Sequence, residues 1–402
     1  MPLRRSKIDY VKVLEDLIRI DTSVPPGNNY GQTVRYLENL FKSVGCKTER
    51  ICIPPENAEG RKNRVNLLAH RRNPGKPRLI FYAHIDVVPA QGWPAFEPKL
   101  KKGKLYGRGA ADMKGAIVSL LLALEKIKKH KNRELNYDLS VMITTDEEIG
   151  QASQLNYLRQ FLGLQRGTYI FSLDSDAGYV SIASLGALQT TIKIRGKSAH
   201  SAMAHLGRNA IEDAVLVLNA LMELKKKVVA RKSKIEANPA SGLRKMEGRL
   251  NVNVIRGGIK ENIIPDECLI SVDRRLIPEE GIREAKKELI DTLRSVKGVK
   301  WEISEILEIP PCFVEDPITD KLALAIENVT GETGKYGTMG SGDLCSIASE
   351  WGAKVFGLGV IRPDCNIHAK NEFVYLKDIE ELSEIITEFL TNQELKQHGA
   401  CN

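Results

Sequence analysis

The sequence predicts an α/β protein with a mixed, mostly parallel sheet flanked by helices and a smaller α+β domain inserted into it. Up to Ser184, strand-like and helix-like segments alternate along the chain. Beyond this point half-exposed strands dominate, until the alternation of helix and strand resumes near Pro310. We therefore expect residues 1–185 and 305–402 to form one domain and residues 186–304 to form the inserted one.

The larger domain is expected to begin with two helices. Between Ile8 and Val44 apolar residues recur at helical spacing, interrupted by the loop DTSVPPGNN. The segments VNLLAHRR, PRLIFYAHIDVV, YDLSVMITTDEE and TYIFSLD are rich in β-branched and aromatic residues, which predicts strands. Amphipathic helices are predicted in MKGAIVSLLLALEKIKK and QASQLNYLRQFLG. Strands that alternate with helices in this way favour a parallel sheet.

The inserted domain is expected to follow the order strand, helix, two strands, helix, strand. GALQTTIKIRG alternates apolar and polar residues, and a long helix is predicted from about Asn209 to Val229. Two strands, GRLNVNVIRGG and ECLISVDRRLI, precede a helix near residues 280–296 and a last strand, VKWEISEIL. After this domain we expect the helix ITDKLALAIENVTG, the strand KVFGLGV and the terminal helix LKDIEELSEIITEFLTNQ.

Composition and charge narrow the class of protein. A chain of 402 residues exceeds what one hydrophobic core usually serves, and 42% apolar with 27% charged residues is typical of a folded protein. The net charge of +8 arises from lysines and arginines spread over predicted helices, so we expect no nucleic-acid partner. No apolar run approaches the roughly 20 residues of a membrane span. Seven cysteines without a CxxC pair favour a reduced, cytoplasmic protein over disulfides or a cysteine zinc site.

Histidines and carboxylates cluster where the predicted strands end. His84 and Asp86 are two positions apart, so they share a strand face. Ligands of open α/β sheets bind beyond the carboxyl ends of the strands, so such residues converge on one crevice. Imidazole and carboxylate groups suit zinc and similar divalent metals. Alone, each group also has a structural explanation, such as a helix N-terminus that favours acidic residues. The further candidates are Asp112, Asp146, Glu147, Glu148, Asp174, Asp176 and His368.

Seven segments, in this order, resemble the motifs of the M20 metallopeptidase family, which includes succinyl-diaminopimelate desuccinylase, acetylornithine deacetylase, aminoacylase and glutamate carboxypeptidase. They are HIDVVP, GRGAADMKG, TTDEEIG, GKSAHSAMAHLGRNAI, GGIKENIIPD, VDRRLIP and HAKNE, and they extend from residue 84 to 372. The resemblance implies a zinc-exopeptidase-like catalytic domain that binds metal. It also implies that the inserted domain is a ferredoxin-like lid and dimerisation domain.

For the metal site, the resemblance implies two Zn²⁺ ions, although Co²⁺ or Mn²⁺ would suit similar ligands. His84 would bind one ion, and Asp86 would hold its imidazole in orientation. Asp112 would bridge the two ions. Glu148 and His368 would complete the shell of the second ion.

The resemblance assigns the general base to Glu147, which would take a proton from the metal-activated water. The third acidic ligand usually lies in a Glu-Pro-Thr stretch, where this chain has SLDSDAGYV. Counting back from Gly186 without a gap selects Asp174, which we favour, whereas a shift in alignment selects Asp176. Because we expect both on one strand face, periodicity does not decide between them.

In the inserted domain, the resemblance implies a residue that acts on a second copy of the chain. His200 would reach the active site of the partner in a homodimer and stabilise the oxyanion. Arg275 would bind the substrate carboxylate, and the neighbouring Arg274 is expected to be solvated on the opposite face. Further expected substrate contacts are Asn262, Ser341 and Gly342.

These expectations lead to a metal-dependent hydrolase that cleaves the amide bond of a small N-acyl amino acid with a free carboxylate. A dipeptidase or carboxypeptidase on the same scaffold is the alternative within enzymes. A non-catalytic binding protein that retains the fold is the alternative outside them, although the intact ligand set with Glu147 argues against it. A serine or cysteine nucleophile is not expected, because no GxSxG elbow or Cys-His signature occurs.

Overall fold

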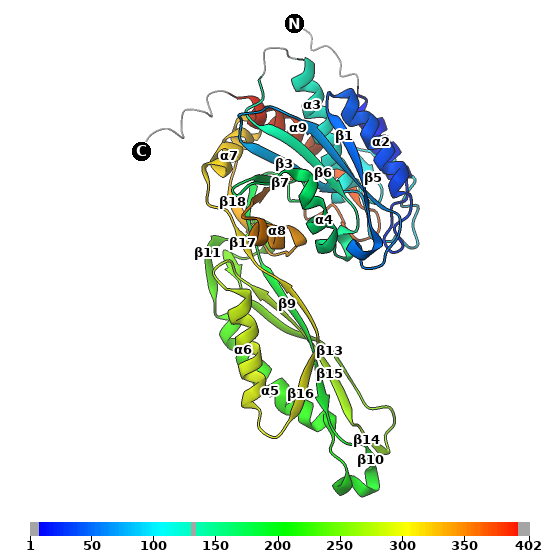
Figure 1. Ribbon diagram of the computed structural model, residues 1–402, viewed down its shortest axis with the longest axis vertical. Coiled ribbons are helices and arrows are strands. Elements are labelled where there is room, and N and C mark those ends of the chain that lie inside the picture. Colours follow the sequence, from blue (N-terminus) through cyan, green and yellow to red (C-terminus); the bar gives the residue numbers. More distant parts are fainter. Residues whose placement is uncertain (1–7, 130–133, 393–402) are drawn as a thin grey trace. The chain divides into compact units, whose positions relative to one another are not determined.

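The computed structural model describes residues 8–129 and 134–392, and the chain divides into two compact units (Figure 1). Unit 1 comprises the residues up to Ile182, Val314–Lys335 and the residues from Ile347 on. Unit 2 comprises Ala183–Phe313 and Tyr336–Ser346. Of the expected larger domain, residues 1–7, 130–133 and 393–402, which include Cys401, lie outside the described residues.

Unit 2 extends beyond the expected insert, residues 186–304, for two reasons. Its last strand continues to Ile309, and the segment 336–346 returns to it. Gly337 forms a parallel bridge with Ala237 and accepts a hydrogen bond from the Asn238 backbone N–H at 2.9 Å. A side chain at Gly337 would clash with Met246, whose sulfur lies 2.0 Å from the position of a Cβ atom. A glycine therefore allows this close approach.

The main sheet has the strand order β1-β2-β6-β3-β7-β19-β8, with β17 and β18 paired to β8. Its four central strands, β6, β3, β7 and β19, are parallel to one another, whereas β2 pairs antiparallel with β1 and β6, and β8 pairs antiparallel with β19. This confirms the mixed sheet with a parallel centre. The strands are β1 (Lys47–Ile53), β2 (Arg64–Arg71), β3 (Arg78–His84), β6 (Asp138–Thr144), β7 (Tyr169–Ser172), β8 (Val180–Ser184), β17 (Cys312–Phe313), β18 (Lys335–Thr338) and β19 (Lys354–Gly357).

Helices flank this sheet, and a small second sheet of order β20-β5-β4 completes unit 1. The helices are α1 (Tyr10–Arg19), α2 (Tyr30–Ser43), α3 (Gly115–Lys129), α4 (Ala152–Leu162), α7 (Pro317–Thr330), α8 (Asp343–Trp351), which crosses the unit boundary, and α9 (Leu376–Thr391). The small strands are β4 (Lys99–Lys101), β5 (Lys104–Tyr106) and β20 (Phe373–Tyr375). Several helices begin at a side chain that caps the first turn: the Asp9 carboxylate, for example, accepts a hydrogen bond from the Lys12 N–H at 3.1 Å.

The core of unit 1 joins the central strands to α3 and α9. Helix α3 is buried on nearly all sides, because Val118 and Leu122 are covered as well as the predicted apolar stripe. The expectation of an amphipathic helix was therefore wrong for α3, which is enclosed instead of lying on the surface. Aromatic rings link the strands: the Phe171 ring centroid lies 5.0 Å from that of Phe81 and 5.8 Å from that of Phe389 in α9.

Unit 2 contains an antiparallel four-stranded sheet of order β13-β15-β9-β16, with α5 and α6 packed on one face. This is the order of a ferredoxin-like fold, as expected from the succession of strands and helices. Its elements are β9 (Gly186–Arg195), β10 (Ala199–His200), α5 (Ala210–Val229), β11 (Lys232–Glu236), β12 (Lys245–Glu247), β13 (Arg249–Gly257), β14 (Ile263–Ile264), β15 (Glu267–Leu276), α6 (Ile282–Ser295) and β16 (Lys300–Ile309).

In the described part of the chain, none of the helices combines the length and the hydropathy that crossing a bilayer requires. The cytoplasmic location and the absence of a nucleic-acid partner stay predictions.

Candidate metal centre

The candidate residues gather where the central parallel strands end. Strand β3 ends at His84, β6 ends two residues before Asp146, and β7 ends two residues before Asp174. Because β6, β3 and β7 are adjacent and parallel, their carboxyl ends lie at one edge of the sheet. The topology of the sheet thus brings together segments far apart in the sequence.

Two groups of possible metal ligands lie at this edge. One consists of His84, Glu147 and Asp174, and the other consists of Asp112, Glu148 and His368. Within each group, one possible ligand atom per residue lies within 4.8 Å of the others. The described structure therefore places six of the residues that we expected at the site in two adjoining clusters.

Asp112 connects the two groups. Its Oδ1 lies 3.3 Å from His84 Nε2, and its Oδ2 lies 2.9 Å from His368 Nε2. His368 Nε2 is also 3.1 Å from Glu148 Oε2. One carboxylate that faces a histidine on either side is the arrangement needed to bridge two ions.

Asp86 lies behind His84 and is fully buried with it. Nδ1 of His84 is 3.1 Å from the Asp86 backbone oxygen and 3.5 Å from its Oδ1. The other carboxylate oxygen of Asp86 accepts a hydrogen bond from the backbone N–H of Glu148 at 3.0 Å. Asp86 therefore contacts residues of both groups, and its place beside Nδ1 leaves Nε2 of His84 to face Asp112.

The residues fit divalent cations on three grounds. Nε2 of His84 is buried and has no hydrogen-bond partner among the described residues. Burial, reinforced by the neighbouring carboxylates, raises the pKa of Glu147 well above its usual range and the pKa of Asp174 to about 7. A cation held between these groups would relieve their repulsion. Imidazole and carboxylate oxygen are also ligands that zinc, cobalt and manganese accept.

The structure separates Asp174 from Asp176. The chain leaves β7 at Ser172, so the two aspartates do not share a strand face and the assumption of strand periodicity was wrong. Asp174 Oδ2 lies 4.0 Å from His84 Nε2. Asp176 belongs to neither ligand group, and its backbone forms a parallel β-bridge with that of Ile361.

The sequence did not reveal the role of Asp146, the first residue of the DEE run. It is fully buried, and its carboxylate accepts hydrogen bonds from Arg64 Nε at 2.8 Å, Gln154 Nε2 at 2.8 Å and the Tyr30 hydroxyl at 3.0 Å. Its φ of 67° turns the chain sharply before Glu147. Asp146 therefore anchors the turn that presents the next two glutamates, through partners that come from other elements.

Glu372 is a second residue whose role was missed, although it ends the quoted segment HAKNE. It is fully buried and accepts hydrogen bonds from the backbone N–H groups of Ala111 and Asp112, at 3.1 and 3.2 Å. Nη1 of Arg108 lies 2.7 Å from its other oxygen. Glu372 therefore holds the turn that carries Asp112.

The remaining expected site residues lie in unit 2. His200 is exposed, and its Nδ1 accepts a hydrogen bond from the Ala202 N–H at 3.1 Å. Asn262 is exposed on the adjoining strand connection, where its backbone oxygen accepts a hydrogen bond from the Ser201 N–H. Strand pairing of His200 with Ile263 brings these two predicted residues together.

Arg275 and Ser341 form a second pair in unit 2. Arg275 contacts both carboxylate oxygens of Asp273, at 2.8 and 3.0 Å, and its Nη1 donates to Ser341 Oγ at 3.0 Å. Gly342 follows in the same loop. The expectation of a solvated Arg274 was wrong, because its guanidinium is buried and bonds to Glu280 and to the Ala285 oxygen.

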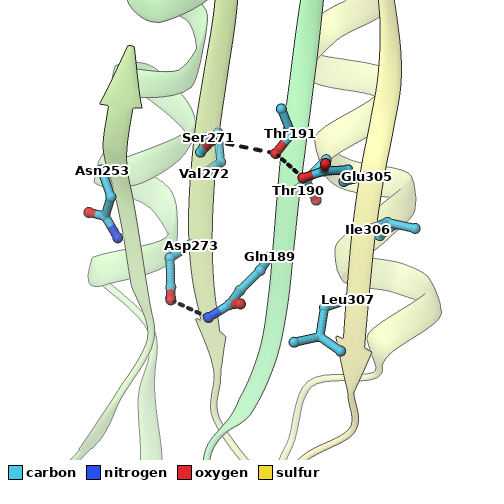
Figure 2. A pocket seen from close by; sticks show the side chains of 10 residues that line it. All are labelled: Gln189, Thr190, Thr191, Asn253, Ser271, Val272, Asp273, Glu305, Ile306 and Leu307. Carbon is cyan, nitrogen blue, oxygen red and sulfur yellow. Dashed lines mark hydrogen bonds between the residues drawn. The ribbon is translucent and has the colours of Figure 1, made fainter. Parts of the chain in front are cut away.

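Asp273 also lines a pocket of about 380 Å³ on the sheet face of unit 2 that the helices leave open (Figure 2). Figure 2 shows a polar floor, in which Gln189 bonds to Asp273 and Thr191 bonds to Ser271 and Glu305. The neighbouring Leu188 and Ile192 point the other way, into the core under the helices, as strand alternation requires.

An open α/β sheet with two histidine and carboxylate groups at the carboxyl ends of its parallel strands defines the class of metal-dependent hydrolases. Comparison of the sequence with known protein families gives the same class. The model of peptidase family M20/M25/M40 matches residues 80–392, and the chain belongs to this family.

A relative agrees with this assignment, and solved structures share the fold. The succinyl-diaminopimelate desuccinylase of Acinetobacter baumannii is 29% identical over 343 residues, covering 81% of this chain and 86% of the relative. The aminopeptidase PepT of Bacillus cereus shares the fold with a TM-score of 0.74 at 21% identity, over 96% of this chain and 98% of that one. A dinuclear metal binding peptidase of the M20 family from Bacillus subtilis has a TM-score of 0.65 at 12% identity, over 94% and 96%.

Proposed function

We propose that this M20 enzyme hydrolyses the amide bond of a small N-acyl amino acid that carries a free carboxylate, with Glu147 as general base. The observation that carries the proposal is the Asp112 carboxylate, which faces His84 on one side and His368 on the other, beside Glu147. The similarity to desuccinylases over 81% of the chain supports an N-acyl substrate over a longer peptide.

The proposed ligands divide between two ions. His84 and Asp174 would hold one ion, Glu148 and His368 would hold the other, and Asp112 would contact both. Bound there, the ions would acidify a water molecule and polarise the carbonyl of the scissile amide. Asp86 would keep Nε2 of His84 turned toward its ion.

Glu147 performs the proton transfer in this proposal. Its carboxylate lies within 4.8 Å of those atoms of His84 and Asp174 that could hold an ion, where it would be near a water molecule activated by that ion. Burial raises its pKa, which suits a group that accepts a proton and then releases it. Glu147 takes a proton from the attacking water and passes it to the leaving amine nitrogen.

Unit 2 would supply the contacts that select the substrate. Arg275 would bind the substrate carboxylate through its guanidinium, with Ser341, Gly342 and Asn262 as further contacts. Asp273 neutralises part of the charge on Arg275. The hydrogen bond from Nη1 to Ser341 would help to hold the guanidinium in the orientation that binds the substrate carboxylate.

We also propose a homodimer through unit 2. Ile211 and Val215 of α5 and Ile255 of the edge strand β13 are 40, 50 and 52% exposed. Ile211 packs against Gly257 at the end of β13, so these side chains form one apolar surface that a second copy would cover. His200 would then complete the site of the partner by stabilising the oxyanion.

A hydrolysis panel tests the substrate assignment. The full chain, supplemented with Zn²⁺, Co²⁺ or Mn²⁺, is assayed on N-acetyl and N-succinyl amino acids and on dipeptides. The proposal requires the highest kcat/KM on an N-acyl amino acid. Preference for a dipeptide would replace it with the peptidase alternative, and metal binding without turnover of any of these substrates would favour a binding protein.

A further inference from the structure

Two cysteines of unit 2 lie in contact although 33 positions separate them. Cys312 lies in β17 and Cys345 lies in the first turn of α8, and their sulfur atoms are 3.3 Å apart. Cys345 is buried, whereas Cys312 is partly exposed. Neither thiol belongs to the candidate metal centre or to the proposed substrate contacts.

The surroundings favour ionisation of one thiol of the pair. Cys345 lies near the N-terminus of α8, where helix N–H groups stabilise a thiolate. The hydrogen bond between the two sulfurs, assisted by the Gly342 N–H and the Ser184 hydroxyl, lowers the pKa of Cys345. The same hydrogen bond, together with burial, raises the pKa of Cys312 well above its usual range. One sulfur is thus the better nucleophile, and the other keeps its proton.

We propose that Cys312 and Cys345 form a site of reversible oxidation, at which a peroxide converts the two neighbouring thiols into a disulfide. A disulfide requires the sulfurs to close from 3.3 Å to about 2.05 Å. The two sulfurs would have to approach each other by about 1.2 Å, through rotation of the two side chains. A small oxidant would approach the pair from the side of Cys312, which is the less buried residue of the two.

The reaction balances with the peroxide as the two-electron oxidant. One thiolate attacks a peroxide oxygen, the O–O bond breaks, and a sulfenic acid and water form. The second sulfur then attacks the sulfenic sulfur, the S–S bond forms, and a second water leaves with the remaining proton. Two thiols and one hydrogen peroxide therefore yield one disulfide and two waters, and a dithiol reductant reverses the change.

The bond would restrain the segment 336–346, which also carries Ser341. Ser341 donates to the Leu185 backbone oxygen at 2.6 Å and accepts from Arg275. A crosslink between β17 and the start of α8 closes a loop of the chain, which reduces the entropy of the unfolded state. Oxidation should therefore raise the melting temperature of the protein by a few degrees.

Peptide mapping tests the proposal, because trypsin places each cysteine in its own peptide, residues 301–321 and residues 336–354. The reduced full chain is treated with a small molar excess of hydrogen peroxide, blocked with N-ethylmaleimide and digested without reductant. We expect these two peptides to be joined in most molecules, and dithiothreitol to release them. The exposed Cys52 is the internal reference and should remain largely alkylated.

Cys312→Ser and the matched substitution Cys46→Ser, at a buried cysteine elsewhere, serve as variants. The joined peptide and the rise in melting temperature should be lost in Cys312→Ser and retained in Cys46→Ser. The proposal is overturned if both thiols of the wild type stay alkylated at a dose that oxidises Cys52. It also fails if other cysteine pairs dominate the map. These wild-type outcomes decide the matter even if a variant does not fold.

Discussion

Asp112 Oδ2 lies 2.9 Å from Nε2 of His368, although 256 positions separate the two residues in the chain. The other oxygen of the same carboxylate lies 3.3 Å from His84 Nε2. Substitutions in this small set of side chains should therefore affect metal binding and catalysis differently, according to which atoms each one removes.

Replacing His84 and replacing Asp86 should give distinct results. His84→Ala removes a ligand and should empty at least one metal position. Asp86→Ala leaves Nε2 in place but removes the carboxylate beside Nδ1, so metal affinity or kcat/KM should fall by about 10–100-fold while metal still binds. Metal analysis after dialysis, with activity on the best substrate, measures both. Equal metal content in His84→Ala and the wild type would contradict the assignment.

Glu147→Gln should retain the metal and lose turnover. The amide keeps the shape of the side chain but cannot accept the proton, so we expect kcat to fall by about 10²–10⁴-fold. Glu148→Gln is the matched control, because it alters the proposed ligand next to the base and should lower metal content as well. If Glu147→Gln loses metal to the same extent as Glu148→Gln, Glu147 is a ligand and not the base.

Glu372→Ala should destabilise unit 1. Arg108 would be left buried without its counter-charge, since the two side chains are only 3% and 1% exposed, and loss of one partner of such a pair costs about 3–5 kcal/mol. The backbone N–H groups of Ala111 and Asp112 would also lose their acceptor, the Glu372 carboxylate. Thermal unfolding and metal titration check both effects. An unchanged melting temperature would show that water replaces the pair.

The stability of unit 1 should depend on Asp138 at low pH. This buried carboxylate accepts hydrogen bonds from the Asn73 N–H and from Arg72 and Arg78, at 2.8 to 2.9 Å. Burial alone would raise the pKa of Asp138, but these contacts outweigh it and hold the pKa below the usual 3.8. A depressed pKa gives stability that is present above about pH 4 and is lost as the pH falls through the folded-state value.

Asp138→Asn should therefore be less stable than the wild type at pH 7, by about 1–3 kcal/mol. The difference should shrink as the pH falls below 4. Melting temperatures of both proteins across this range measure it. A difference that is constant with pH would mean that the contacts do not depend on ionisation.

His200→Ala should lower kcat without loss of metal. If His200 acts on the partner's site, co-expression of His200→Ala and Glu147→Gln chains creates one complete site in each mixed dimer. Random pairing should then restore about a quarter of the wild-type rate, although each variant alone is nearly inactive. No gain over the separate variants would place His200 in its own chain's site or outside catalysis, and His205→Ala is the matched control.

The sequence predicted the order of elements well, because apolar spacing is a local property. The long helix expected from about Asn209 to Val229 is α5, Ala210–Val229, and the strand ending HID contains β3, which stops at His84. Enclosure of α3 could not be predicted, since α3 ends at Lys129 and the helix α9 that covers it begins only at Leu376. Burial on a second face depends on tertiary partners that spacing does not reveal.

The sequence predicted which residues form the site more readily than the hydrogen bonds and ion pairs that hold them in place. His84, Asp112, Glu147, Glu148 and His368 occur in the segments that resemble the family, and the structure brings them together. The anchors Asp146 and Glu372 also occur in those segments, but their partners are arginines and backbone groups from other elements. Arg274 shows the reverse error, because strand alternation placed it away from Arg275 without showing that α6 buries that face.

The bridge between Ala237 and Gly337 has a consequence for synthesis of the chain on the ribosome. Unit 2 lacks its last segment until Ser346 has emerged, and unit 1 lacks β19 and α9 until still later. Unit 2 can therefore reach its final packing only after Ser346 has emerged, and unit 1 only after α9 has emerged. Truncation after β16 should leave two incomplete units in place of one finished domain and one fragment.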